Sequence, residues 1–414
     1  MNVPIDHRPA VLAIFALTYL GLAVGRIPGL KVNRTGIALL GAIGMMMASG
    51  CSPADTTSVM NWPTLLLLFG FFVISAQLRL SGFYDMLAAR ISGWAGKPRK
   101  FLLMLVLVSA GLSSFLNHDV VCFVLAPVVA GALVKKRVDP VPFLVALAAS
   151  SNIGSAATLI GNAQNMVIAT AAGLGFARYM AWSLVPVLLG LAATYAVTRM
   201  AAHGGPPRIL KDEVEPAEAV YPLDRYHMIK GVVVLAAVIA LLFTSIPREI
   251  TVLVAASVHL LSTKFRTQDL LALVDWQILV LFGSLFVVGG TFQATGYGEE
   301  CVRWMQGVGF NPAAPLNEVL LTTGLSVLIN NAPAVVLLVK LLPMTQATVA
   351  YVLAVANSFA GNAFLTASVA NIIVVQQARR QGIVISFGNF ARIGVPVALA
   401  SLGGLVAWAA LVGK

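Results

Sequence analysis

The chain has 414 residues, of which 59% are hydrophobic and only 10% are charged, whereas a soluble domain usually carries about 25% charged residues. With a mean hydropathy of +0.89, this composition excludes a soluble globular domain and predicts a polytopic membrane protein. The net charge of +11 does not indicate a nucleic-acid partner, because the basic residues fall mainly in loops between apolar runs. The three cysteines have neither disulfide nor zinc spacing, so we expect no metal.

Ten apolar runs are predicted to span the membrane, since one helical crossing needs roughly 20 residues. Five lie in each half of the chain. They cover residues 10–30, 36–49, 62–80, 141–172 and 179–200, and then 227–245, 249–261, 276–295, 345–376 and 387–412. The one long hydrophilic stretch, residues 201–226, contains Gly204-Gly205-Pro206-Pro207 and then several acids. This composition predicts a linker between the two halves.

The second half of the sequence repeats the first. GLSSFLNHDVVCFVLAP, which begins at Gly111, is answered by GLSVLINNAPAVVLL, which begins at Gly324. At nearly the same spacing, Arg34, Asp55 and Trp62 recur as Arg248, Asp269 and Trp276. A duplicated unit in an apolar chain is typical of secondary transporters, and an odd number of spans per copy turns the second copy upside down. We therefore expect an all-α protein of two inverted-topology repeats, residues 1–200 and 227–414.

Each repeat also contains a predicted re-entrant hairpin. Residues 101–134 form two apolar segments, each about 15 residues long, on either side of a polar Asn117-His118-Asp119 triplet. Both ends of this region carry Lys and Arg, the mark of the cytoplasmic face, so the segment is expected to dip into the membrane and return. The second hairpin, residues 316–342, should enter from the opposite face. The same charge bias predicts a cytoplasmic linker and both termini outside, in a plasma or inner membrane.

One span of each repeat is rich in residues that interrupt helices. These spans read SSNIGSAATLIGNAQN from Ser150 and NSFAGNAFLTASVAN from Asn357, and their Gly, Asn, Ser and Thr compete with helical hydrogen bonding. The N-termini of half-helices can bind an anion, and carbonyls freed at C-termini can coordinate Na⁺. Any single polar residue here could instead hold the break together. The expected substrate- or ion-binding set is Asn117, Ser151, Asn152, Gly154, Thr158, Gly161, Asn162, Asn165, Asn330, Asn331, Asn357, Gly361, Asn362, Thr366, Ser368 and Asn371.

Asp119 is the only carboxylate that this topology places at membrane depth. An ionisable residue inside the membrane is a functional candidate by default, and the neighbouring His118 has an imidazole that titrates near neutrality when unperturbed. We expect the two residues to couple transport to H⁺ or Na⁺, with no other cofactor. The alternative for Asp119 is a purely structural helix N-cap.

The segments LNHDVVCFVLAP, SNIGSAATLIGNAQN, LINNAP and AGNAFLTASVANIIVV resemble the ion transporter superfamily. The similarity is greatest to the anion permeases of the arsenite-permease-like branch, and more distant to the divalent-anion:sodium symporters. It covers residues 62–397. The resemblance implies a substrate site between hairpin tips and broken helices, an elevator-like alternating-access motion and often a homodimer.

These observations predict a secondary active transporter of a small anion, either an oxyanion such as arsenite or an organic anion, coupled to H⁺ or Na⁺. A Na⁺/H⁺ antiporter and an anion channel are the alternatives within transport. An enzyme is not expected, because the sequence has no HExxH motif, no GxSxG motif and no metal-spaced His/Cys cluster.

Overall fold

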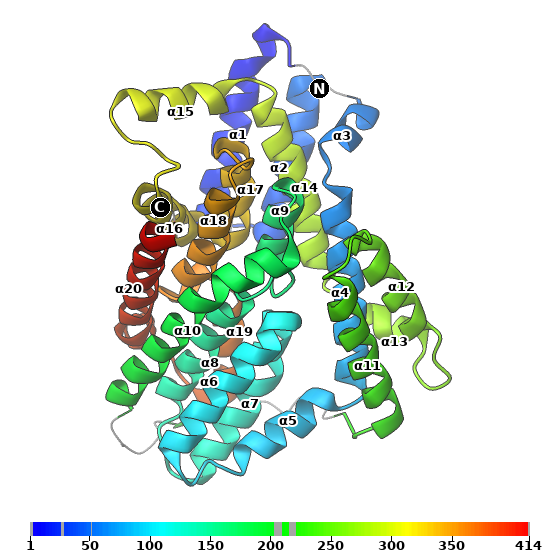
Figure 1. Ribbon diagram of the computed structural model, residues 1–414, viewed down its shortest axis with the longest axis vertical. Coiled ribbons are helices and arrows are strands. Elements are labelled where there is room, and N and C mark those ends of the chain that lie inside the picture. Colours follow the sequence, from blue (N-terminus) through cyan, green and yellow to red (C-terminus); the bar gives the residue numbers. More distant parts are fainter. Residues whose placement is uncertain (1–2, 26–28, 51, 203–208, 215–220, 413–414) are drawn as a thin grey trace.

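The computed structural model describes residues 3–25, 29–50, 52–202, 209–214 and 221–412 (Figure 1). The first half contains η1 (Ile5–His7), α1 (Arg8–Val24), α2 (Arg34–Ser49), α3 (Pro53–Val59), α4 (Trp62–Leu80), α5 (Phe83–Ser92), α6 (Pro98–Phe115), α7 (His118–Lys135), α8 (Val141–Ser155), α9 (Ala163–Ala171) and α10 (Phe176–Ala201). The second half contains α11 (Arg225–Leu241), α12 (Arg248–Leu260), α13 (Thr267–Ala272), α14 (Trp276–Gln293), α15 (Tyr297–Gly307), α16 (Pro315–Ile329), α17 (Asn331–Leu341), α18 (Ala347–Ala360), η2 (Leu365–Ala367), α19 (Val369–Arg380) and α20 (Phe387–Val412).

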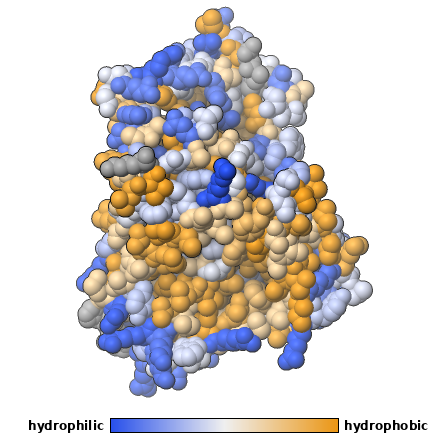
Figure 2. All heavy atoms as spheres, viewed as in Figure 1, coloured by the Kyte–Doolittle hydropathy of each residue, from blue (hydrophilic) through white to orange (hydrophobic). Residues whose placement is uncertain are grey.

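The predicted all-α polytopic fold is confirmed. Among the described residues, seven helical segments are long and apolar enough to cross a membrane: 5–24, 62–80, 98–115, 118–135, 176–201, 276–293 and 387–412. Shorter apolar helices include α2, α8, α16, α17 and α18. In Figure 2, hydrophobic residues cover the middle of the visible face, and hydrophilic residues gather at its two ends. This distribution is that of a multi-pass membrane protein.

The two repeats pack against each other reciprocally. Helix α4 packs on α12, and its counterpart α14 packs on α2. In the same way α7 packs on α19 while α17 packs on α9, and α10 contacts α18 while α20 contacts α8. Each contact between a helix of the first repeat and a helix of the second is therefore matched by a contact between their two duplicates. A pseudo-two-fold relation between inverted repeats produces this exchange.

Several duplicated residues have the same local structural function in both halves. The Asp55 carboxylate accepts a hydrogen bond from the Ser52 amide (2.9 Å) before α3, and Asp269 accepts one from the Arg266 amide (3.3 Å) before α13. Gly82 and Gly296 precede α5 and α15 with φ of 73° and 81°, a left-handed backbone that glycine adopts without steric cost. The recurrence of these residues in both repeats is therefore explained by their function in the local fold, and it does not require a function in ligand binding.

The sequence did not predict every element. The short helices α3, α5, α13 and α15 were missed, and so was an antiparallel pairing of β1 (Ile209–Val214) with β2 (Gln381–Ile383). Helices α6 and α7 each have 18 residues rather than about 15, so their length alone would allow a full crossing. Of the expected linker, residues 203–208, including Gly204–Pro207, and 215–220 lie outside the described residues. The membrane orientation and the repeat boundaries stay predictions.

Candidate functional site

The tip of the first hairpin lies against the break between α8 and α9. The Ser114 hydroxyl, near the end of α6, donates a hydrogen bond to the Gly154 carbonyl (2.9 Å), and the Thr158 hydroxyl donates to the Ser114 carbonyl. Asn117 at the tip and Asn162 at the break line one small cavity of about 10 Å³. The tip therefore ends where the spanning helix is interrupted, as a re-entrant hairpin requires.

Polar side chains hold this first break open. The Asn162 side chain accepts a hydrogen bond from the Asn165 amide (2.7 Å) and so caps α9. Asn165 Nδ2 in turn donates to the carbonyl of Thr158 (2.9 Å), which lies in the break beyond the end of α8. A Cβ on Gly161 would lie 2.3 Å from the Ser155 carbonyl oxygen, and one on Gly154 would lie 2.4 Å from the Ala110 Cα. Both glycines are needed for close backbone approach.

The second hairpin tip meets the second break in the same way. Asn330, with φ of 78°, donates from Nδ2 to the Thr366 carbonyl (3.2 Å). Asn357 Nδ2 donates to the Asn331 carbonyl (3.2 Å) and to the Ser326 hydroxyl (2.9 Å). A Cβ on Gly361 would lie 2.7 Å from the Asn331 Nδ2. The tip and the break are thus in direct contact in both repeats.

Asn152 joins the two breaks across the repeat interface. Its Nδ2 donates to Asn362 Oδ1 (3.0 Å) and Asn371 Oδ1 (3.1 Å), and its Oδ1 accepts from the Ser368 hydroxyl (3.0 Å). Asn371 Nδ2 then donates to the Gly361 carbonyl (2.6 Å), within the second break. All of these side chains are buried. The expected site residues therefore form one cluster at the centre of the protein.

Of the expected set, Thr366 is the exception. Its side chain is exposed, and only its backbone carbonyl contacts the cluster. Several other members are buried but have polar atoms without a hydrogen-bond partner, although nearly all buried polar atoms in proteins are paired. Such atoms are free to contact a ligand or ion: Asn165 Oδ1, Asn331 Oδ1 and Asn362 Nδ2.

Asp119 is not the N-cap of α7. That position belongs to Asn117, whose Oδ1 accepts a hydrogen bond from the Asp119 amide (2.8 Å). Asp119 lies in the first turn, with its Oδ1 3.5 Å from His118 Nε2. Their residue exposures are only 8% and 7%. The purely structural cap is therefore replaced by a buried carboxyl–imidazole pair at the hairpin tip.

Two further carboxyl groups, those of Asp275 and Glu318, were missed from the sequence, which led us to place only Asp119 at membrane depth. Asp275 caps α14 by accepting a hydrogen bond from the Ile278 amide (3.1 Å), and it lies within electrostatic range of Asp119. Glu318, on α16 of the second hairpin, is 1% exposed. Glu318 could have been found from the sequence, because it is an acidic residue inside the predicted apolar hairpin, residues 316–342.

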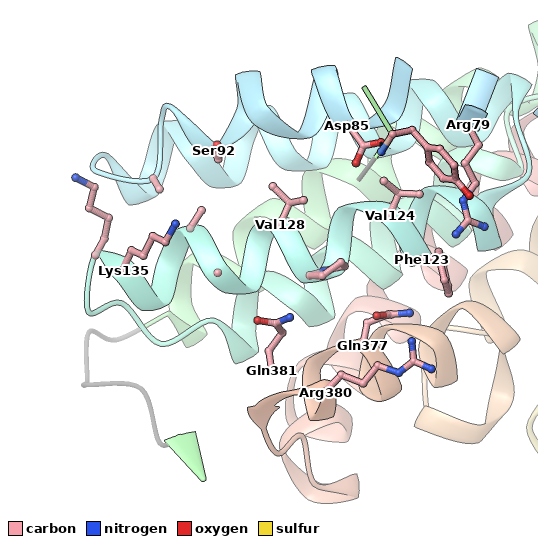
Figure 3. Close-up of a pocket in the computed structure, with 16 residues that line it drawn as sticks. Arg79, Asp85, Ser92, Phe123, Val124, Val128, Lys135, Gln377, Arg380 and Gln381 are labelled. Atoms are coloured by element: carbon pink, nitrogen blue, oxygen red, sulfur yellow. Dashed lines mark hydrogen bonds between the residues drawn. The ribbon is translucent and has the colours of Figure 1, made fainter. Parts of the chain in front are cut away.

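A larger cavity opens beside the first hairpin, between α5, α7 and α19 (Figure 3). Its volume is about 430 Å³, and its basic lining residues are Arg79, Lys135, Lys136 and Arg380. In Figure 3, Arg79 lies at one end near Phe123, and Lys135 lies at the other. Asp85 is the acidic residue of the lining, and burial raises the pKa of its carboxyl, with Arg79 acting in the opposite direction. The lining has an excess of positive charge, which attracts anions.

The described residues contain no cluster of three or more His, Cys, Asp or Glu side chains that could hold a metal ion.

Comparison with known proteins agrees with this architecture. Residues 11–356 match the family described as citrate transporter, CitMHS. The chain is 30% identical over 420 residues to the uncharacterized transporter MT2759 of Mycobacterium tuberculosis, with 94% of this chain and 96% of that protein covered. It is 26% identical over 452 residues to the silicon efflux transporter LSI3 of Oryza sativa, with 90% and 91% covered. Among solved structures, the YdaH transporter of Alcanivorax borkumensis superposes with a TM-score of 0.60 at 14% identity, and 98% of each chain is covered.

Proposed function

Because the chain belongs to the citrate transporter (CitMHS) family, we propose that it is a secondary active transporter that moves a small anion, coupled to H⁺ or Na⁺. That it is a membrane transporter follows from the family, and the resemblance to the ion transporter superfamily is thereby confirmed. What we propose beyond the family is that the substrate is an anion, that its transport is coupled to H⁺ or Na⁺, and that the motion is elevator-like.

The observation that carries the proposal is the convergence of four helix N-termini. Helices α7, α9, α17 and α19 have as N-caps Asn117, Asn162, Asn330 and Ser368, and all four caps lie in the cluster of tips and breaks. A helix N-terminus carries a partial positive charge and unpaired N–H groups, which bind anions. The side chains of Asn330 and Ser368 do not cap their own helices. The amides of α17 and α19 are thus the best available anion-binding groups.

The basic cavity supports an anion rather than a cation as the cargo. It is walled by α7, which belongs to the first hairpin, and by α19, which begins at the second break. Arg79, Lys135, Lys136 and Arg380 on its walls raise the local concentration of anions. On the predicted topology this cavity opens to the cytoplasm. It would be the entrance or exit for the anion on that side.

The central cluster is closed in this conformation, which supports alternating access. The cavity beside Asn117 and Asn162 measures about 10 Å³, roughly the space that one water needs. A citrate or oxyanion cannot enter until a hairpin tip moves away from its break. Once the tip has closed again, side-chain hydrogen bonds hold each hairpin to its broken helix, so we expect the closed hairpins and broken helices to move together as the transporting unit.

Asp119 supplies the coupling group in this proposal. Its carboxyl is buried, has an unpartnered oxygen and adjoins the His118 ring. A buried charge is costly unless it is paired or neutralised, so Asp119 favours binding of a proton or Na⁺ before the tip closes.

The test is transport into proteoliposomes with citrate, silicate and arsenite, under imposed H⁺ or Na⁺ gradients. Asp119→Asn should lose gradient-driven accumulation of the anion at least tenfold. Asp139→Asn is the matched control, because Asp139 only accepts a hydrogen bond from the Val141 amide (3.0 Å) and asparagine can do the same. Accumulation by Asp119→Asn equal to that by Asp139→Asn would refute the coupling function.

A further inference from the structure

Helix α16 carries a column of buried polar side chains that leads to the second hairpin tip. Glu318, Thr322 and Ser326 are spaced four residues apart along α16, and Asn330 follows at its end. Their exposures are 1%, 0%, 0% and 3%. Side chains four residues apart lie one above another on a helix, about 6 Å apart along its axis. At the inner end of the column, Ser326 accepts the hydrogen bond from Asn357 Nδ2 (2.9 Å).

The Glu318 carboxyl has no side-chain partner. Neither of its oxygens accepts a hydrogen bond of ordinary geometry, and the same is true of the Thr322 hydroxyl. Its charged form is favoured only by the backbone of Leu353 on α18, whose effect is smaller than that of burial.

Helix α16 packs against α1, α17, α18, α20 and η2. The charged and titratable residues of these elements are Arg8 and Tyr19 on α1, Lys340 on α17, Tyr351 on α18 and Arg392 on α20. Among the described residues, none of these side chains forms an ion pair with Glu318.

An ionised carboxylate cannot remain in such a place at low cost. Transfer of an unpaired charge from water to a protein interior costs several kcal/mol or more, whereas a protonated carboxyl costs far less. Glu318 is therefore protonated in this conformation.

The duplication shows that the fold does not need this acid. In the alignment of the two hairpins, Thr322 and Ser326 correspond to Ser109 and Ser113 of α6, but Glu318 corresponds to Leu105. Leu105 is also fully buried. A hydrophobic side chain thus fills the equivalent position, and the acid in the second repeat requires another explanation.

We propose that Glu318 is a proton-binding site in the second hairpin, in addition to Asp119 in the first, and carries a proton that moves with the anion. The proposal rests on the transport function proposed above and deepens it by naming the residue of the second repeat that binds H⁺. A proton from water forms an O–H bond with the carboxylate when Glu318 is exposed on one side. That bond persists while the residue is buried and breaks to release the proton to water on the other side. The column Thr322–Ser326 links the site to the tip that Asn330 and Asn357 hold.

The first test does not depend on transport. Infrared spectra of the purified protein at pH 7 should contain the carbonyl stretch of a protonated carboxylic acid, and Glu318→Gln should lose intensity there. Glutamine is a neutral isostere of the protonated acid, so this variant should fold. Glu300→Gln is the control, because Glu300 is exposed on α15. A spectrum of Glu318→Gln that matches wild type in this region would overturn the proposal.

The second test is transport. Under a pH gradient, Glu318→Gln should accumulate at least tenfold less anion than wild type, whereas the control Glu300→Gln should accumulate as much as wild type. Unchanged pH-driven accumulation, or accumulation that only a Na⁺ gradient drives in wild type, would contradict the assignment. If wild type moved no anion while the infrared band depended on Glu318, the proposed anion transport would fail and the proton site would stand.

Discussion

Removal of the Asn152 side chain is the sharpest structural test of the contact between the repeats. Asn152 donates two hydrogen bonds and accepts a third, and all three partners belong to the second repeat. In Asn152→Ala, Asn362 Oδ1, Asn371 Oδ1 and the Ser368 hydroxyl lose these bonds while they remain buried. The perturbation is therefore confined to the interface between the two broken helices.

The size of the effect follows from those three bonds. A buried hydrogen bond contributes about 0.5–1.5 kcal/mol net in proteins, and pairs inside membranes average about 0.6 kcal/mol. Three bonds and their unsatisfied partners should thus destabilise the folded state by roughly 2–4 kcal/mol. For a chain of this length the loss corresponds to a decrease in Tm of roughly 2–5 °C.

The assay is thermal unfolding of the purified protein in detergent. The fraction of protein that remains monodisperse is measured at each temperature. Asn389→Ala is the matched control, because Asn389 is exposed, and surface substitutions usually change the free energy of unfolding by less than about 0.5 kcal/mol. Equal Tm values for Asn152→Ala and Asn389→Ala would refute the argument that this amide holds the repeats together.

Three other substitutions test local claims. Gly154→Ala should destabilise the protein by about 1–3 kcal/mol, because its Cβ would lie 2.4 Å from the Ala110 Cα. Gly111→Ala has open space around it and should stabilise α6 by up to about 1 kcal/mol; Tm shifts of the same sign for both would contradict the packing. Asp224 has a pKa held below its ordinary value, first by the His227 amide and then by Lys264. Its charge therefore stabilises the fold at neutral pH, and this contribution is lost as the pH falls below about 3.9. The stability difference between wild type and Asp224→Asn should shrink on acidification, and a constant difference would exclude the effect.

The duplication made much of the fold predictable. Residues that recur at a fixed spacing, such as Trp62 and Trp276, begin corresponding helices in both repeats. The breaks were predictable because Gly, Asn and Ser cannot sustain a buried helix without local hydrogen bonds to replace the lost ones. In the structure Asn162 and Asn165 make those bonds.

Other features depend on tertiary contacts that the sequence does not display. The residue that caps α7 is identified by one hydrogen bond: the side chain of Asn117 accepts from the Asp119 amide, so Asn117 is the cap. The exposure of Thr366 depends on where the second break meets the surface. The basic cavity combines side chains from α4, α5, α7 and α19, and no local pattern connects Arg79 with Arg380. The isolation of Glu318 became visible only once its neighbours were placed around it.

The most direct test of the central claim is whether the wild-type protein accumulates an anion against its own gradient. Proteoliposomes that contain the purified protein should concentrate citrate, silicate or arsenite when a pH gradient is imposed, and should stop when the gradient is dissipated. Passive equilibration of the anion, unaffected by any ion gradient, would identify a channel. Exchange of Na⁺ for H⁺ with no anion movement would identify an antiporter, and either result would contradict the proposed function.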